Sequence, residues 1–183
     1  KSILYLFPQS GIILQNSTIE ISNLNSLFNI RGTKDNPVSN IHFSGIRFLH
    51  TNRTYMEDYE PLLRSDWMIY RGGAIFYENA EDCKITDCTF TDLGGNAIFN
   101  SGYIRNNTFK GNHIYNCGAS GISFIGSPKA VRSPSFNYNE FVPLDKLDTV
   151  KGPRTDDYPS DCLVHDNLIH DIGLVEKQVA GVQ

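Results

Sequence analysis

The chain has 183 residues, a length that suits one domain, and 40% of its residues are hydrophobic while 20% are charged. This balance excludes an intrinsically disordered protein, because the chain holds enough apolar side chains to build a core. The net charge of −4 argues against nucleic acid as the main partner, and no apolar run approaches the roughly 18 residues of a membrane-spanning helix.

The two ends of the sequence read as cuts through a longer protein. The chain begins at Lys1 without a methionine or an apolar signal region, and it ends at Val182-Gln183 inside a predicted strand. We therefore expect residues 1–183 to be part of a single domain that is truncated at both ends.

A repeated pattern dominates the chain from residue 43 onward. A weak copy at 43–48 is followed by clear copies at 85–98, at 109–122 and at 164–173, the last of which resumes at 180–182. Each clear copy has an apolar residue, another five positions later, Asp or Asn two after that, and then Gly two later. Such self-similarity is typical of a solenoid.

The spacing between copies predicts the kind of solenoid. Phe90 and Ile114 are 24 residues apart, which suits one coil of three short strands and three turns. Phe48 to Phe90 is 42 residues and Ile114 to Ile169 is 55, so insertions separate these copies. No long stretch keeps the spacing of an amphipathic helix. We therefore predict an all-β fold, a right-handed parallel β-helix of the pectate-lyase-like kind with long loop insertions.

Polar residues recur in fixed columns of the repeat. Asn112 and Asn167 share a column with Cys88, where asparagine side chains form a ladder along the solenoid. A second column lies at a turn and consists of Asp92, Asn116 and Asp171. A glycine follows each of them two positions later, namely Gly94, Gly118 and Gly173. We expect these glycines to adopt positive φ. The four cysteines fall within the repeat and read as small buried apolar residues.

Two insertions interrupt the repeat, at about 51–72 and 127–161. Both mix aromatic residues with carboxylates and arginines, and the second holds five of the eight prolines. Insertions in a repeat protein tend to collect on one face, often the binding face. Because aromatic faces and carboxylates suit sugars, we predict an oligosaccharide or polysaccharide groove, although packing of the loops onto the coils explains any single aromatic residue equally well.

Five residues are the candidates for contact with sugar. A shorter irregularity at 174–179 carries Glu176, Lys177 and Gln178, polar residues where a plain coil needs none. Glu176 is the one weak catalytic candidate, and the predicted substrate-binding residues are Trp67, Arg132, Lys177 and Gln178. The five histidines are scattered without metal-ligand spacing, so we expect structural or surface roles for them and no metal site.

Several segments resemble the bacterial β-helical glycoside hydrolases. Residues 3–8 look like the short strand that enters their β-helix, and Asp35–Phe43 looks like the start of their first regular coil. Residues 118–122 with 131–133, and 166–173 with 176–182, resemble the next coils. The nearest named group is glycoside hydrolase family 141, which has fucosidase and xylanase activities. The resemblance implies an extracellular or periplasmic hydrolase without a cofactor, and it implies that the catalytic acids lie on later coils.

Two other classes remain open. A polysaccharide lyase or epimerase on the same fold needs a base and often Ca²⁺ to neutralise a uronate. A non-enzymatic β-helix binds carbohydrate or serves as a stalk, and the fold alone does not separate these. In a glycoside hydrolase two carboxylates flank the scissile bond, and their separation decides retention or inversion.

Overall fold

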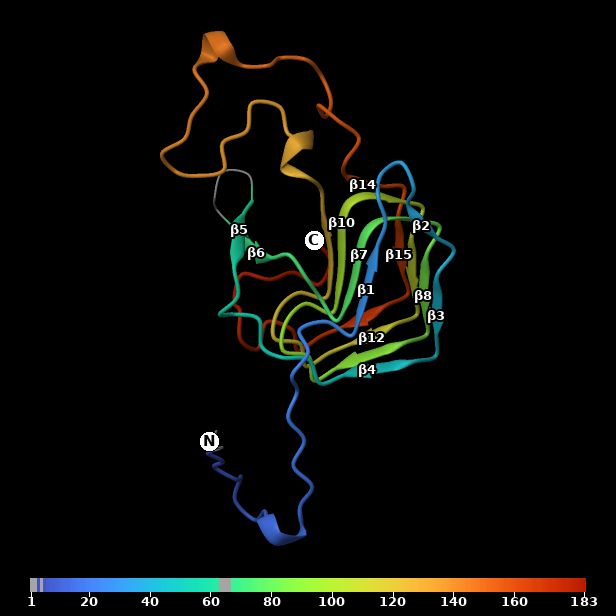
Figure 1. Cartoon of the computed structure of the whole chain (residues 1–183), viewed down its shortest axis with the longest axis vertical. Coiled ribbons are helices and arrows are strands. Elements are labelled where there is room, and N and C mark those ends of the chain that lie inside the picture. The colour runs from blue at the N-terminus through green and yellow to red at the C-terminus, as the bar shows by residue number, and fades with distance from the viewer. Residues whose placement is uncertain (1–2, 4, 63–66) are drawn as a thin grey trace.

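The computed structural model of the chain describes residues 3, 5–62 and 67–183, so residue 4 and residues 63–66 of the first predicted insertion lie outside the described residues. Coils of short strands stack on one another, and the second insertion and the N-terminal segment project away from them in opposite directions (Figure 1). Short 3-10 turns are the helical elements within this part of the chain: η1 (Leu14–Asn16), η3 (Pro128–Ala130) and η4 (Leu144–Lys146).

Three parallel sheets run along the stack, one on each side of the coils. Sheet 1 has the order β1-β7-β10-β13 and also pairs β2 with β7 and β14 with β10; sheet 2 has the order β3-β8-β11-β15, and sheet 3 the order β4-β9-β12-β16. Their bounds are β1 Phe28–Arg31, β2 Val38–Ser39, β3 His42–Ser44, β4 Arg47–Leu49, β7 Ile75–Glu81, β8 Lys84–Thr86, β9 Thr89–Thr91, β10 Ile98–Arg105, β11 Thr108–Lys110, β12 His113–Ile114, β13 Ile122–Ile125, β14 Pro159–Ser160, β15 Leu163–His165 and β16 Leu168–Ile169.

The register confirms the spacing read from the repeat. Phe48 pairs with Phe90, Phe90 with Ile114, and Ile114 with Ile169, all in parallel. The predicted all-β parallel solenoid is therefore confirmed. The first coil begins earlier than the sequence indicated, since β1 starts at Phe28 and precedes Asp35.

The core is a set of apolar columns inside the coils. Because successive strand residues point to opposite faces, every second residue enters the core, and equivalent residues stack from coil to coil. Ile75, Ile98 and Ile122 form one such fully buried column. Phe48 and Phe90 stack with ring centroids 4.8 Å apart. Cys83, Cys88 and Cys117 are buried and all four thiols are free, as expected for small apolar residues.

The predicted asparagine ladder is present. The Asn112 Nδ2 donates to Asn167 Oδ1 at 2.9 Å, and Asn112 Oδ1 accepts from the Cys88 N–H at 3.0 Å. Asn167 Nδ2 donates in turn to the Phe109 carbonyl at 2.9 Å. These bonds satisfy buried polar groups at the corner between sheets 2 and 3 and tie the third coil to its neighbours.

The expectation of positive φ at three glycines is right only for Gly173. The positive φ values belong instead to the polar residues two positions earlier, Asp92 (53°), Asn116 (51°) and Asp171 (47°), because Asp and Asn tolerate this conformation. Gly94 and Gly118 are required for space. A Cβ on Gly94 would lie 2.0 Å from the Asn52 carbonyl oxygen, and one on Gly118 would lie 2.2 Å from that of Gly94.

The N-terminal segment does not form the strand that the resemblance implied. Residues 3 and 5–8 have no strand geometry, and Tyr5 and Phe7 are exposed. A strand needs a neighbour for its backbone hydrogen bonds, and this segment extends away from the coils (Figure 1). Within the described residues no helix has the length and apolarity needed to cross a membrane.

Candidate functional site at the outer face of sheet 1

The outer face of sheet 1 carries two rows of side chains between the insertions. Strand alternation places Phe76, Phe99 and Ser123 in one row, and the second row consists of Arg31, Glu78, Ser101 and Ile125. Phe76 and Phe99 stack at 5.9 Å and are almost fully buried although they lie outside the coils. Another part of the chain must therefore cover them.

The cover is a hairpin from the first insertion. Strands β5 (Tyr59–Pro61) and β6 (Met68–Tyr70) pair antiparallel, and Ile69 packs on Phe76 and Phe99 with Leu62 and Ile125 at the margin. This contact forms a small apolar cluster separate from the main core. It fixes the hairpin over sheet 1 as one wall of a groove.

Arg71, at the end of the hairpin, fastens this wall to the sheet. Its Nε donates to Glu60 Oε2 at 2.8 Å, and its Nη2 donates to the other oxygen of the same carboxylate and to the Gly126 carbonyl at 3.0 Å. The Nη1 donates to Ser101 Oγ at 2.7 Å and to the Ile125 carbonyl at 3.2 Å. All five guanidinium N–H groups are thereby used, and the Glu60 carboxylate is held in one orientation.

A cavity of about 400 Å³ opens where the hairpin meets the second insertion. Glu60, Leu62 and Arg71 line it from the hairpin, and Ile125 and Gly126 line it from the end of β13. The second insertion contributes the opposite wall, which consists of Ser127, Pro128, Ala130, Val131, Phe136, Pro153 and Tyr158. An apolar cavity with a few convergent polar groups is the usual form of a small-molecule site.

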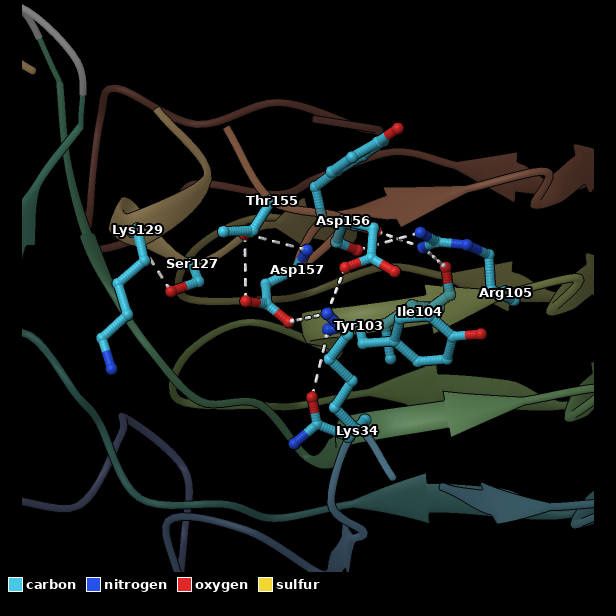
Figure 2. Close-up of polar contacts among 11 residues, drawn as sticks. Lys34, Tyr103, Ile104, Arg105, Ser127, Lys129, Thr155, Asp156 and Asp157 are labelled. Atoms are coloured by element: carbon cyan, nitrogen blue, oxygen red, sulfur yellow. Dashed lines mark hydrogen bonds and ion pairs between the residues drawn. The ribbon is translucent and has the colours of Figure 1, made fainter. Parts of the chain in front are cut away.

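The base of the second insertion is tied to the first coil by charge. Lys34 pairs with Asp156, and its Nζ lies 3.6 Å from Asp157 Oδ1, while Thr155 Oγ1 donates to Asp157 Oδ2 at 3.0 Å (Figure 2). The hydrogen bond from Lys34 holds the pKa of Asp156 below its ordinary value. The insertion therefore returns to the coils at a position set by ion pairs.

Arg105 closes the same corner from β10. Its Nη2 donates to the Asp156 carbonyl at 2.9 Å and its Nη1 donates to the Tyr158 carbonyl (Figure 2). The guanidinium lies 4.3 Å from the ring centroid of Tyr103 and 5.1 Å from that of Tyr158. Tyr158 thus stands at the cavity wall on a rigid support.

A second hollow, of about 360 Å³, continues the groove along sheet 1. It is lined by Lys34, Arg71, Glu78, Asn79, Ser101, Gly102, Ser127, Pro128, Lys129 and Asp157. Arg31 bonds Glu78 at 2.6 Å at its edge. Arg31, Lys34 and Arg71 are each paired with a carboxylate, whereas Lys129 has no ion pair within the described residues.

The predicted site residues do not all meet at this groove. Glu176 Oε1 accepts from Thr54 Oγ1 at 3.3 Å and lies near Tyr59, on the hairpin face opposite to Glu60. Burial, followed by the nearby Glu176, raises the pKa of Tyr59, and the Tyr59 hydroxyl has no hydrogen-bond partner of normal geometry within the described chain. Lys177 Nζ donates to the Gly173 carbonyl at 2.9 Å, and Gln178 is exposed.

The remaining two candidates belong to the insertions themselves. Trp67 adjoins the cavity, because its carbonyl accepts from the N–H of the cavity-lining Leu62 at 2.8 Å. Arg132 donates to Asp148 at 2.6 Å, to the Gly152 carbonyl at 2.9 Å and to the Pro153 carbonyl at 3.1 Å. The hydrogen bonds of Arg132 therefore hold the second insertion in shape.

Sequence reasoning missed Glu60, Arg71, Lys34 and Asp157 as groove residues. Glu60 and Arg71 were visible only as two of many charged residues in the first insertion, and Lys34 with Asp157 lie more than a hundred positions apart. The described residues contain no group of three or more His, Cys, Asp or Glu side chains arranged for a metal ion.

The comparisons with known proteins address the fold. Residues 1–169 match the family described as "Right handed beta helix region". The comparison with curated proteins found no match, and neither did the comparison with solved structures. Because the match covers most of the chain and the strands pair in parallel from coil to coil, the chain belongs to the right-handed β-helix family.

Proposed function

We propose that the chain is part of a glycoside hydrolase that binds a complex polysaccharide in the groove on the outer face of sheet 1. The observation that carries the proposal is the convergence of the two insertions, far apart in the sequence, on one cavity of about 400 Å³ with Glu60 and Arg71 at its edge. A β-helix that serves only as a stalk needs no such walls.

The cavity has the two kinds of surface that a sugar uses. Phe136 and Tyr158 offer aromatic side chains to the apolar face of a pyranose ring. Glu60 accepts hydrogen bonds, and its orientation is fixed by Arg71, so a sugar hydroxyl meets an acceptor that does not have to reorganise. This combination suits a carbohydrate better than a purely apolar ligand.

The charge pairing favours a neutral glycan. A lyase or epimerase must neutralise a uronate carboxylate with free cations or Ca²⁺. Arg31, Lys34 and Arg71 are engaged with carboxylates of the protein itself, which leaves Lys129 as the one cation lining the groove without an ion pair among the described residues. We therefore place a hydrolase acting on uncharged sugars ahead of the lyase and of a purely carbohydrate-binding role.

Hydrolysis requires two carboxylates across the scissile bond, about 5–5.5 Å apart for retention and roughly 6.5–9.5 Å apart for inversion. Glu60 is the carboxylate at the cavity. We therefore take Glu60, in place of an acid on the later coils that the resemblance implied, as our first candidate for one of the pair, and Glu176 on the other side of the hairpin becomes the second choice. Membership of glycoside hydrolase family 141, and an extracellular or periplasmic location, are part of the same proposal and rest on the resemblance of the coil segments.

The test measures binding and turnover on one panel of neutral plant-wall oligosaccharides and aryl glycosides, with EDTA in parallel. Binding by the chain, followed by calorimetry, should fall at least tenfold in Phe136→Ala and stay unchanged in Tyr138→Ala, a matched control in the same insertion that is 85% exposed. Hydrolysis by the unsubstituted intact protein should persist in the presence of EDTA. The Glu60→Gln variant should have no hydrolytic activity. Calcium-dependent unsaturated product would replace the hydrolase with a lyase, and equal binding by both aromatic variants would remove the cavity from the proposal.

A further inference from the structure

Two histidines from different coils meet on the outer face of sheet 3. Ile114 and Ile169 are paired core residues of β12 and β16. His113 precedes the first and His170 follows the second, so both side chains turn outward. Their Nε2 atoms lie 2.8 Å apart.

The contact with Asp171 selects the tautomer of the His170 ring. Asp171 Oδ2 accepts a hydrogen bond from His170 Nδ1 at 2.8 Å, which places the proton of the neutral ring on Nδ1 and leaves a lone pair on Nε2, directed at His113. A carboxylate behind an imidazole in this way is the usual outer partner of a metal-binding histidine. Tyr115 stacks on both rings, at 4.4 Å from His113 and 5.4 Å from His170, and limits their rotation.

We propose that His113 and His170 form a binding site for a divalent transition-metal ion such as Zn²⁺ or Cu²⁺. Imidazole nitrogens are preferred ligands of these ions. Two nitrogens bound to one tetrahedral ion at 2.0–2.1 Å lie about 3.3 Å apart, so the rings have to separate by about 0.5 Å from their present 2.8 Å. Each ring also has to tilt, so that its Nε2 lone pair points at the ion and not at the other nitrogen. In the metal-free site His113 donates its Nε2 proton to His170. On binding, this proton leaves to solvent, His113 takes a proton on Nδ1 in its place, and water fills the remaining coordination positions.

Such an ion would link the third coil to the fourth on the outer face of sheet 3. The bound state needs both imidazoles at one place, and only the folded chain brings together residues 57 positions apart. The metal therefore binds the native state in preference to the unfolded chain and raises the unfolding temperature. The inference does not depend on the proposed function.

The experiment titrates the chain with CuCl₂ and with ZnCl₂ after dialysis against EDTA, by calorimetry and by the electron paramagnetic resonance spectrum of Cu²⁺. We expect one ion per chain, and we expect His113→Ala and His170→Ala each to weaken binding at least tenfold. Asp171→Asn should weaken it about 10–100-fold, and Asn suits the positive φ of this position as Asn116 does in its own coil.

The matched control is His165→Ala. His165 makes the same contact with the next residue, from Nδ1 to Asp166 at 2.9 Å, and its replacement should change neither affinity nor spectrum. Circular dichroism and the metal-free unfolding midpoint establish that each variant is folded. Absence of binding to the parent chain, or unchanged binding by folded His113→Ala and His170→Ala, would overturn the site.

Discussion

Arg71 donates two of its guanidinium N–H groups to the Glu60 carboxylate. It donates the other three to the Ser101 hydroxyl of β10 and to the carbonyls of Ile125 and Gly126 at the end of β13. One residue thus connects the hairpin of the first insertion, the outer face of sheet 1 and the start of the second insertion. Because the guanidinium is planar and its donors are fixed in a fork, the position of Glu60 at the cavity follows from the position of the sheet.

Replacement of Arg71 by Ala should lower the free energy of unfolding by about 1–3 kcal/mol, because it leaves a half-buried carboxylate and two carbonyls without these donors. Urea unfolding measures the change. The control is Arg31→Ala, whose pair with Glu78 has an arginine side chain that is 56% exposed, and there the loss should stay below about 1 kcal/mol. Equal losses in the two variants would show that Arg71 does not fasten the hairpin.

The asparagine ladder predicts a second stability effect. Asn167→Ala removes the acceptor for both the N–H and the side chain of Asn112, so the free energy of unfolding should fall by roughly 1–3 kcal/mol. The exposed loop residue Asn139 provides the comparison, because Asn139→Ala removes no ladder contact. An unchanged unfolding midpoint in Asn167→Ala would take Asn167 out of the ladder.

Substitution should destabilise the chain at Gly118 and leave its stability almost unchanged at Gly45. Gly118→Ala places a Cβ against the backbone of Gly94 and should cost about 1–3 kcal/mol of unfolding free energy, as overpacking does. Gly45 has positive φ, but no atom lies within 4 Å of its Cβ position, and its counterparts Asp87 and Asp166 adopt the same conformation. Gly45→Asn should therefore stay within about 0.5 kcal/mol. A larger loss in Gly45→Asn than in Gly118→Ala would contradict this assignment.

Buried thiols predict a loss of stability in alkali. Burial raises the pKa of Cys117 to about 12 from an ordinary value of 9.0. Between these values the folded chain keeps a proton that the unfolded chain releases. The contribution to stability is therefore complete below pH 9 and declines as pH rises toward 12, by about 1.4 kcal/mol per pH unit. Urea titrations at pH 8 and pH 10 should show a smaller decline in Cys117→Ala than in the parent chain, and parallel declines would assign the effect to other groups.

The sequence by itself determined the solenoid. Three features can be read from the sequence: the apolar columns, the 24-residue step and the Asn112–Asn167 ladder. They are readable because each coil repeats the same local requirements as its neighbour. The turn column was located correctly, but the role of its glycines was misjudged. A glycine can be required by positive φ or by close approach of two backbones, as between Gly94 and Gly118 of adjacent coils. The sequence shows a glycine in both cases and does not distinguish the two reasons.

Only the tertiary structure decided which residues of the insertions meet. Glu60 and Phe136 line the same cavity. Lys34 forms an ion pair with Asp157, and His113 forms a hydrogen bond with His170. Glu176 and Arg132 form their hydrogen bonds away from the cavity. The insertions have no repeat. The first is positioned by apolar packing on Phe76 and Phe99, and the second by isolated ion pairs such as that of Lys34 with Asp156. Those contacts join residues at arbitrary separations in the chain, and the spacing of residues along a sequence carries no record of them.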